Sequence, residues 1–309
     1  MNKLKIVFMG TPSFAVESLK QLINDKQEIL AIITAPDKAA GRGKKISESD
    51  VKIYAKNLGI KILQPTNLKS EDFISELKSL NADLFVVVAF RMLPKEVWQI
   101  PKFGTINLHA SLLPDYRGAA PINHAILNGD TKTGLTTFFI NEEIDTGKVI
   151  FQEKCEILDT DNAGSLHDKL MILGGELLIK TVNSIANATA KSIDQKSIKI
   201  ENTRQAPKLN KEFCKLDFNK SAKDLHNKVR ALSPYPTAWF DLEDSKNTIK
   251  VFETSYEIVE HNYQTGKIIS DNKSQLKISA KDGFLIIHEL QISGKKRMKT
   301  KDFLNGYKF

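Results

Sequence analysis

Asn107, His109 and Asp145 are residue types that donate hydrogen bonds and move protons in group-transfer chemistry, and the sequence places them in two short stretches. Residues 104–108 predict the end of a strand, and because alternate strand residues face the same way, the amide and the imidazole leave the sheet together. A second predicted strand, residues 133–140, runs into the loop that carries Asp145. If the two strands are neighbours, the three side chains meet at one sheet edge. The set contains no Ser or Cys nucleophile, so it suits transfer to an incoming nucleophile. A single histidine near a strand end is more often structural, so this interpretation depends on all three residues.

The elements around these residues predict a ligand site. Residues 111–114 break the strand pattern into a loop, and residues 117–121 lead into a helix whose first turn accommodates Pro121. In open α/β sheets, ligands bind in the loops at the carboxyl ends of the strands. The turn at residues 90–94 follows a buried strand in the same way, and its backbone amides and carbonyls are suited to a flat heterocycle.

The first two thirds of the chain alternate between strand and helix patterns, which predicts a Rossmann-like, mostly parallel sheet. The expected strands are residues 4–9, 28–34, 61–63, 83–89 and 148–158, and the expected helices run to about residue 23 and over residues 50–58, 70–80 and 165–186. Gly10 lacks the second and third glycines of a dinucleotide fingerprint, so the pattern does not support nicotinamide or flavin binding.

A long connection, residues 35–49, interrupts this alternation, and it is expected to be a flexible loop. Its tip carries Arg42, Lys44 and Lys45 and suits a phosphate backbone, although it lacks the spacing of a P-loop. A solvated mobile loop would have the same composition.

Composition predicts a soluble enzyme of two domains, with 309 residues, 41% hydrophobic and 27% charged. The longest apolar run, residues 84–90, is too short to cross a bilayer, and no signal-peptide pattern opens the chain, so a cytoplasmic protein is expected. Cys155 and Cys214 are far apart and histidines do not cluster, which argues against a disulfide framework, a redox pair or a zinc site.

The last third of the chain is the basic part. Residues 1–206 carry a net charge of +2 and residues 207–309 a net charge of +6, which is typical of a nucleic-acid partner or of a lysine-rich solvated face. A domain boundary near residue 206 is expected, within a linker over about residues 190–209. Beyond it we expect a helix over residues 221–232, which Ser221 caps, and a small barrel of short strands. The expected strands are residues 248–252, 266–270, 275–280 and 284–290.

Residues 107–122, followed by residues 144–147, resemble the 10-formyltetrahydrofolate-dependent formyltransferases. Further segments resemble the branch of that family whose amine acceptor is charged initiator tRNA: residues 8–15, 36–45, 290–298 and 302–306. The resemblance covers essentially the whole chain. It departs at Asp115, where relatives commonly carry another residue type, and a carboxylate there would weaken the attraction for phosphate.

The resemblance implies a Rossmann-like catalytic domain, residues 1–206, followed by a small OB-like β-barrel that binds tRNA, residues 207–309. It implies that the α-amino group of methionyl-initiator tRNA attacks the formyl carbon of 10-formyltetrahydrofolate, giving the formyl-methionyl-tRNA of translation initiation. Asn107 would donate a hydrogen bond to the oxyanion, His109 would add charge, and Asp145 would hold the histidine and help to move a proton. No metal is required.

The resemblance also implies binding residues and an expected monomer. The folate donor would contact Phe90, Arg91, Met92, Leu93, Ser111, Leu112, Leu113, Pro114, Asn141, Glu142 and Glu143. The tRNA would contact Arg42, Lys44, Lys45, Lys295, Lys296 and Arg297.

Three alternatives remain open from the sequence. A formyltransferase that acts on an amino sugar nucleotide would share the residues around Asn107 and His109, but the basic insertion and basic barrel argue against it. A hydrolase that passes the formyl group to water would use the same three residues. A nucleic-acid-binding module without catalysis would not need them.

Overall fold

The computed structural model describes residues 3–40, 45–199, 203–242 and 247–309, and the chain divides into two compact units. The first comprises Met1–Gly118, Thr133–Cys155 and His167–Gln205, and the second comprises Ala119–Lys132, Glu156–Leu166 and Ala206–Phe309.

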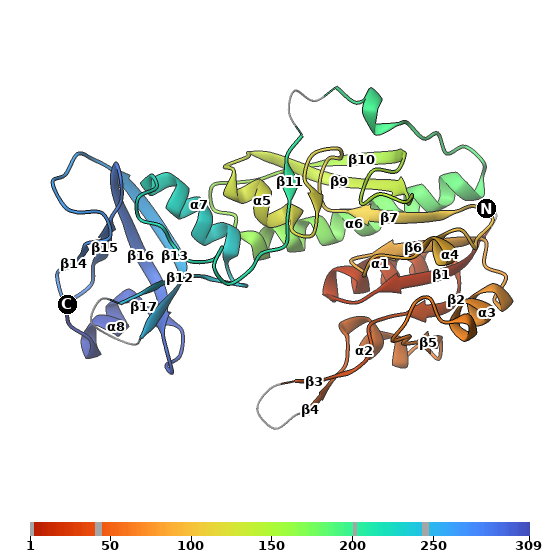
Figure 1. The fold of residues 1–309 in the computed structure, drawn as a ribbon, viewed down its shortest axis with the longest axis horizontal. Helices are drawn as coiled ribbons and strands as arrows, with labels where there is room; N and C mark the ends of the chain where they lie inside the picture. The colour runs from red at the N-terminus through yellow and green to blue at the C-terminus, as the bar shows by residue number, and fades with distance from the viewer. Residues whose placement is uncertain (1–2, 41–44, 200–202, 243–246) are drawn as a thin grey trace. The chain divides into compact units, whose positions relative to one another are not determined.

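A seven-stranded sheet forms the centre of the first unit, in the order β10-β9-β7-β6-β1-β2-β5 (Figure 1). Its strands are β1 (Lys5–Gly10), β2 (Glu28–Ile33), β5 (Lys61–Leu63), β6 (Leu84–Val88), β7 (Thr105–His109), β9 (Lys132–Phe139) and β10 (Val149–Glu156). The pairs among β5, β2, β1, β6 and β7 are parallel, and β9 runs antiparallel to β7. The predicted mostly parallel, Rossmann-like sheet is therefore confirmed.

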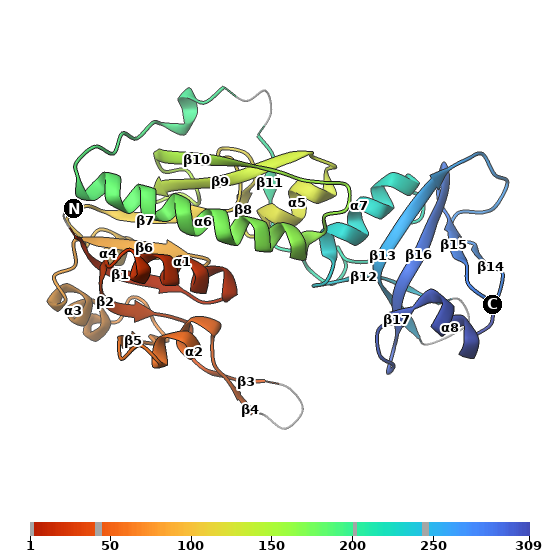
Figure 2. The same ribbon diagram turned by 180° about the vertical axis from the view of Figure 1, so that it is seen from behind.

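Helices cover both faces of this sheet because its parallel strands are apolar on both sides. On one face, α1 (Ser13–Asn24) lies beside α6 (Ala163–Ala186), as Figure 2 shows. On the other face, α3 (Glu71–Ser79) and α4 (Lys95–Trp98) pack on Val7, Met9, Phe85 and Val87. The packing against α6 is close: a Cβ added to Gly174 would lie 2.9 Å from Leu108 of β7.

The connection over residues 35–49, expected to be a loop, instead contains a short antiparallel hairpin of β3 (Lys38–Ala40) and β4 (Lys45–Ser47). Three hydrogen bonds fix the base of this hairpin beside α2 (Asp50–Lys56) and beside the residue that follows β5. Asp37 accepts hydrogen bonds from Lys52 at 2.5 Å and from Gln64 at 2.8 Å, and the hydroxyls of Thr34 and Ser49 lie 2.7 Å apart. Arg42 and Lys44 lie outside the described residues, as does the side chain of Lys45.

An antiparallel sheet forms most of the second unit, in the order β12-β13-β16-β15-β14, with β17 also paired to β16. Its strands are β12 (Ala238–Asp241), β13 (Thr248–Ile258), β14 (Ile268–Ser270), β15 (Leu276–Ser279), β16 (Gly283–Ile292) and β17 (Met298–Lys299). Among the described residues this path is open, as in the partly open barrel of an OB fold.

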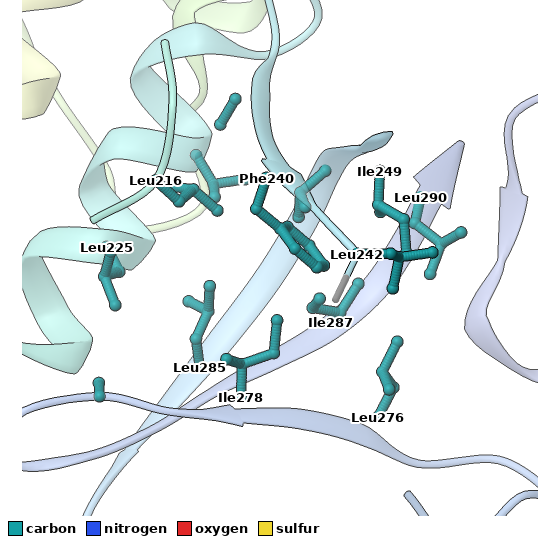
Figure 3. Close-up of a cluster of buried hydrophobic side chains, with 14 of the residues drawn as sticks. Leu216, Leu225, Phe240, Leu242, Ile249, Leu276, Ile278, Leu285, Ile287 and Leu290 are labelled. Carbon is teal, nitrogen blue, oxygen red and sulfur yellow. The ribbon is translucent and has the colours of Figure 1, made fainter. Parts of the chain in front are cut away.

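The core of the second unit lies between this sheet and α7 (Ala222–Leu232), with α8 (Thr300–Gly306) at its end. Figure 3 shows Leu225 of the helix and Phe240, Ile278 and Leu285 of the strands in one buried cluster. Ser221 caps α7 as predicted, because its hydroxyl accepts a hydrogen bond from the Asp224 amide at 3.0 Å.

Two earlier chain segments complete the second unit. The helix α5 (Pro121–Leu127), which has its proline at the first position as expected, packs against α7. The Asn123 side chain donates to the Ala231 carbonyl at 2.7 Å, and Arg230 donates to the carbonyls of Leu158 and Asp161. Among the described residues, no helix is both long and apolar enough to span a membrane.

Candidate active site

The candidate residues lie at the carboxyl edge of the central sheet. The sheet order turns at β1, which has β2 on one side and β6 on the other, and such a switch point is where open α/β sheets bind ligands. Asn107 and His109 belong to β7, beside β6, and His109 is the last residue of that strand. The antiparallel neighbour β9 ends beside the start of β7, where the Ile140 amide donates to the Thr105 carbonyl. The loop that follows β9 then returns Asp145 to within 3.7 Å of His109, so the structure brings the two stretches together.

Both ring nitrogens of His109 face oxygen atoms. The side chain is 7% exposed, and its Nε2 lies 2.9 Å from the Tyr116 carbonyl oxygen. Because a carbonyl only accepts, this nitrogen carries a hydrogen and donates it. The Nδ1 lies 3.7 Å from Asp145 Oδ2, within ion-pair distance. The histidine ring is thus held in one orientation, with the carboxylate at its second nitrogen.

Asn107 is half-buried, and its side-chain amide has no hydrogen-bond partner among the described residues. A half-buried amide of this kind can bind a ligand without first breaking an internal hydrogen bond. It lies two residues before His109 on the same strand, so both point to the same side of the sheet. The site therefore offers a neutral donor beside a histidine and a carboxylate.

Two contacts with neighbouring backbone, at Asp145 and at Gly147, fix the loop that carries Asp145. The Gly118 amide donates to Asp145 Oδ2 at 2.9 Å, and the carboxylate side chain is 14% exposed. Two residues on, a Cβ added to Gly147 would lie 1.6 Å from the Phe139 carbonyl oxygen. Only glycine fits at that position.

The loop after β7, one of the segments expected to bind folate, is tied to the strands beside it. Thr136 of β9 donates to the Ser111 carbonyl at 2.6 Å and accepts from the Leu113 amide at 3.0 Å. The peptide bond between Leu113 and Pro114 is cis, and Leu112 is half-buried. This loop is ordered by backbone hydrogen bonds, so its shape is set before a ligand arrives.

The other two segments expected to bind folate are joined by an ion pair. Lys95 of α4, which follows residues 90–93, pairs with Glu142 and lowers the pKa of that carboxyl. Arg91, next to Phe90, donates to the Thr66 carbonyl at 3.1 Å. The remaining residues of the two segments differ in exposure. In the first, Met92 is 67% exposed and Leu93 is buried. In the second, Asn141 accepts a hydrogen bond from the Thr146 hydroxyl at 2.9 Å, and Glu143 is exposed.

Asp115, where the resemblance led us to expect another residue type, is paired with an arginine. Its carboxylate lies 2.6 Å from the Arg204 guanidinium, which in turn lies 4.4 Å from the centre of the Tyr116 ring. This pair also anchors residue 204 beside the carbonyl that receives the His109 hydrogen bond. The carboxylate charge is thus balanced locally.

Gln195, which no sequence pattern predicted, is 2% exposed and donates to the Asp145 carbonyl at 2.8 Å. It lies in a short 3₁₀ helix, η1 (Gln195–Ser197), within the connector after α6. The contact joins residues 50 positions apart, and no spacing or periodicity in the sequence signals it. Among the described residues, no group of three or more His, Cys, Asp and Glu side chains is arranged to hold a metal ion.

The basic residues predicted near the end of the chain differ in their surroundings. Lys295 and Lys296 are exposed, and neither has an ion-pair partner among the described residues. Arg297 pairs with Glu289 and lies 4.3 Å from the centre of the Phe252 ring. The two lysines are therefore more available to a phosphate than the arginine is.

The fold is shared with a solved formyltransferase, and family models show the class. An N-formyltransferase from Helicobacter canadensis, solved in complex with folinic acid and dTDP-3-aminofucose, superimposes with a TM-score of 0.67 over 92% of this chain and 98% of its own, at 23% identity. The family model of the formyl transferases matches residues 4–182, and the model of the formyl transferase C-terminal domain matches residues 208–308. The chain belongs to the formyl transferase family.

The relatives with higher identity act on tRNA, according to their names. The methionyl-tRNA formyltransferase of Bacteroides thetaiotaomicron is 50% identical over 309 residues, which cover 99% of this chain and 96% of the relative. That of Flavobacterium johnsoniae is 51% identical over 311 residues, covering 100% of this chain and 98% of the relative.

Proposed function

We propose that this protein transfers the formyl group of 10-formyltetrahydrofolate to the α-amino group of methionyl-initiator tRNA. Half of its residues are identical, over the full chain, to relatives named methionyl-tRNA formyltransferase. The observation that carries the chemistry is the Asn107 amide, which has no hydrogen-bond partner in the described part of the chain, beside the His109 and Asp145 pair. That arrangement has a donor for a developing oxyanion and a proton acceptor nearby, and it needs no covalent intermediate on the protein.

The reaction needs charge stabilisation and a proton transfer. As the amine adds to the formyl carbon, the carbonyl oxygen gains negative charge, and the Asn107 amide would donate a hydrogen bond to it. Such a donor is worth about 3 to 4 kcal/mol in other enzymes. Asp145 would take the proton that the amine loses and help to deliver one to the folate nitrogen as its bond to the formyl carbon breaks, while His109 adds charge.

The segments at residues 90–93, 111–114 and 141–143 would hold the folate. The backbone of the first and last would clasp the pterin, while the loop after β7 would line the pocket. The hydrogen bonds from Thr136 and the ion pair of Lys95 with Glu142 support this role, because they preorganise the segments.

The tRNA would bind through phosphate contacts of Lys295, Lys296 and Arg297 and through the inserted residues Arg42, Lys44 and Lys45, which supply affinity without sequence information. Arg42 would read an acceptor end that opens easily; full activity of Arg42→Ala on initiator Met-tRNA would contradict this role. The proposed reaction is cytoplasmic and needs only a monomer.

The test is transfer of labelled formyl from 10-formyltetrahydrofolate to initiator Met-tRNA, beside uncharged tRNA and free methionine. We expect product only on the charged tRNA, and a loss of at least about 100-fold in His109→Ala and Asn107→Ala. His167→Ala is the matched control, since His167 also lies beside an aspartate, at 2.9 Å, but at the start of α6 and partly exposed. It should keep full activity.

Other outcomes identify the alternatives. Transfer to an amino sugar nucleotide, with none to Met-tRNA, would replace the proposed acceptor. Release of formate at the rate of formyl loss would indicate a hydrolase. Tight tRNA binding without folate turnover would indicate a binding module.

A further inference from the structure

The backbone of Asp145 adopts a conformation that non-glycine residues adopt seldom, although aspartate does so more often than most. Its φ angle is +56°, in the left-handed region. In this region the Cβ of a non-glycine residue crowds the backbone, so the conformation persists only where its surroundings enforce it. Something must therefore hold Asp145 in place, and its carboxylate position depends on that support.

The side chain of Gln195 provides this support. Its Nε2 donates to the carbonyl oxygens of Asp145 and Gly147, each at 2.8 Å, and so spans the turn. Its Oε1 accepts from the Arg117 guanidinium at 2.7 and 3.2 Å. A carboxamide has two donor hydrogens and two acceptor lone pairs, so this buried group is fully used.

The same amide couples two loops that meet at the carboxylate. Arg117 precedes Gly118, whose amide donates to Asp145 Oδ2 at 2.9 Å. Gln195 thus holds the carbonyl of Asp145 directly. It also holds Arg117, which is next to Gly118, the residue whose amide donates to the Asp145 carboxylate. A displacement of this amide would move both supports at once.

Gln195 is itself held rigidly by its neighbours along the chain. Ile193 forms a backbone bridge to Val149 of β10, with hydrogen bonds of 2.8 and 2.9 Å. The Asp194 carboxylate accepts from the Lys196 amide at 2.9 Å and caps η1. The glutamine is therefore presented from a fixed backbone to the opposite loop.

We infer that Gln195 is a positioning residue for Asp145, and that its carboxamide, rather than its bulk, holds the carboxylate beside His109. This inference depends on the proposed role of Asp145 in formyl transfer. Glutamate at this position would set a negative charge against two carbonyl oxygens, and methionine would fill the space without donating. Both changes remove the two hydrogen bonds that Gln195 donates to the carbonyl oxygens of Asp145 and Gly147, at nearly constant volume, and glutamate keeps the acceptor for Arg117.

The experiment measures formyl transfer to initiator Met-tRNA by Gln195→Met, Gln195→Glu and the control Gln99→Glu. Gln99 is exposed at the end of α4, so this control introduces the same charge into the same unit. We expect kcat to fall at least about tenfold in both Gln195 variants, with KM for the folate and for the tRNA changed by less than about threefold. The control should match the wild type.

A double-mutant cycle tests whether Gln195 acts through Asp145. In an Asp145→Asn background, the further loss caused by Gln195→Met should be less than about twofold, because the group it positions is already removed. A loss as large as in the wild-type background would overturn the inference. The inference would also be overturned if kcat fell only in proportion to the fraction of folded protein, measured by circular dichroism and folate binding in the same samples.

Failure of this inference is distinguishable from failure of the proposed function. No transfer by the wild type would refute the proposed acceptor and reaction. Full activity of Asp145→Asn would refute the role on which the inference rests. An active wild type, an impaired Asp145→Asn and fully active Gln195 variants would refute the role of Gln195 alone.

Discussion

At the scale of single residues, Gly147 has no room for a side chain. A Cβ there would lie 1.6 Å from the Phe139 carbonyl oxygen and 3.2 Å from the Phe138 ring. The backbone cannot move away freely, since the Phe139 amide donates to the Lys148 carbonyl at 3.0 Å. Gly147→Ala should therefore lower the free energy of unfolding by about 1–3 kcal/mol, the usual cost of overpacking.

Urea unfolding of this variant beside Gly306→Ala checks the prediction. Gly306 ends α8 with no atom within 4 Å of an added Cβ, so its substitution should leave the midpoint nearly unchanged. Equal midpoints for Gly147→Ala and the wild type would contradict the argument.

The residues of the candidate site divide into those that local pattern reveals and those that only the fold reveals. Asn107 and His109 could be predicted because a strand has a fixed period of two, and Asp145 because it follows the next strand pattern. Gln195 could not, because it lies in a connector without periodicity and reaches a loop 50 residues away. The structure supplies that pairing through the bridge of Ile193 with Val149.

At the scale of elements, α7 is joined to β13 through a half-buried histidine. His226 Nδ1 lies 3.0 Å from the Thr254 hydroxyl, and its ring lies 5.3 Å from that of Tyr256. The pKa of His226 is lowered to about 4, chiefly by burial and in part by the Arg230 charge, while the Asp159 charge opposes this shift. The histidine is therefore neutral in the folded protein at neutral pH.

This pKa predicts a loss of stability in mild acid. The unfolded histidine titrates near pH 6.5 and the folded one near pH 4, so between these values the unfolded chain binds more protons. The stabilisation is complete above pH 6.5 and is lost as the pH falls toward 4. At pH 4.5 the cost should be about 1–2 kcal/mol, after a reduction for the partial exposure of the ring.

Urea unfolding of the wild type and His226→Gln at pH 7.5 and pH 4.5 measures the contribution of His226 to the loss of stability in acid. The variant should lose less stability between the two conditions than the wild type does. Measurements at pH 7.5 and 8.5 serve as the internal control, because this histidine contributes no slope there. Equal losses in both proteins would show that His226 does not titrate as described.

Most elements could be predicted from the sequence because their apolar residues repeat with the period of a strand or helix. The strand over residues 84–88 and the helix from residue 163 are both visible in this way. The hairpin of β3 and β4 could not be predicted, because its two strands have three residues each. It depends on side chains outside it, Lys52 and Gln64, which fix Asp37 at its base.

At the scale of the whole molecule, the uneven charge predicts how tRNA binding depends on salt. Lys295 and Lys296 are exposed without ion-pair partners in the described part of the chain. If each neutralises one phosphate, the double variant Lys295→Gln/Lys296→Gln should lower the slope of log affinity against log salt by about 1 to 2.

Filter binding of initiator tRNA over a range of salt concentrations measures this slope. Lys69→Gln/Lys78→Gln is the matched control, since both lysines are exposed in the first unit and the net charge changes equally. An unchanged slope in the 295/296 variant, or an equal change in the control, would show that these lysines do not meet the tRNA.

We propose the boundary near residue 206 as the point where the catalytic part ends, although the chain enters the second unit before that. Residues 119–132 and 156–166 already belong to it, and α5 contributes the Asn123 side chain that binds the Ala231 carbonyl of α7. A gene segment encoding only residues 207–309 would lack residues 119–132 and 156–166, which pack in the same unit. Recombination between relatives could therefore not exchange the last third of the chain independently. In such a recombinant α5 would come from one parent and α7 from the other, so the two helices have to be inherited together.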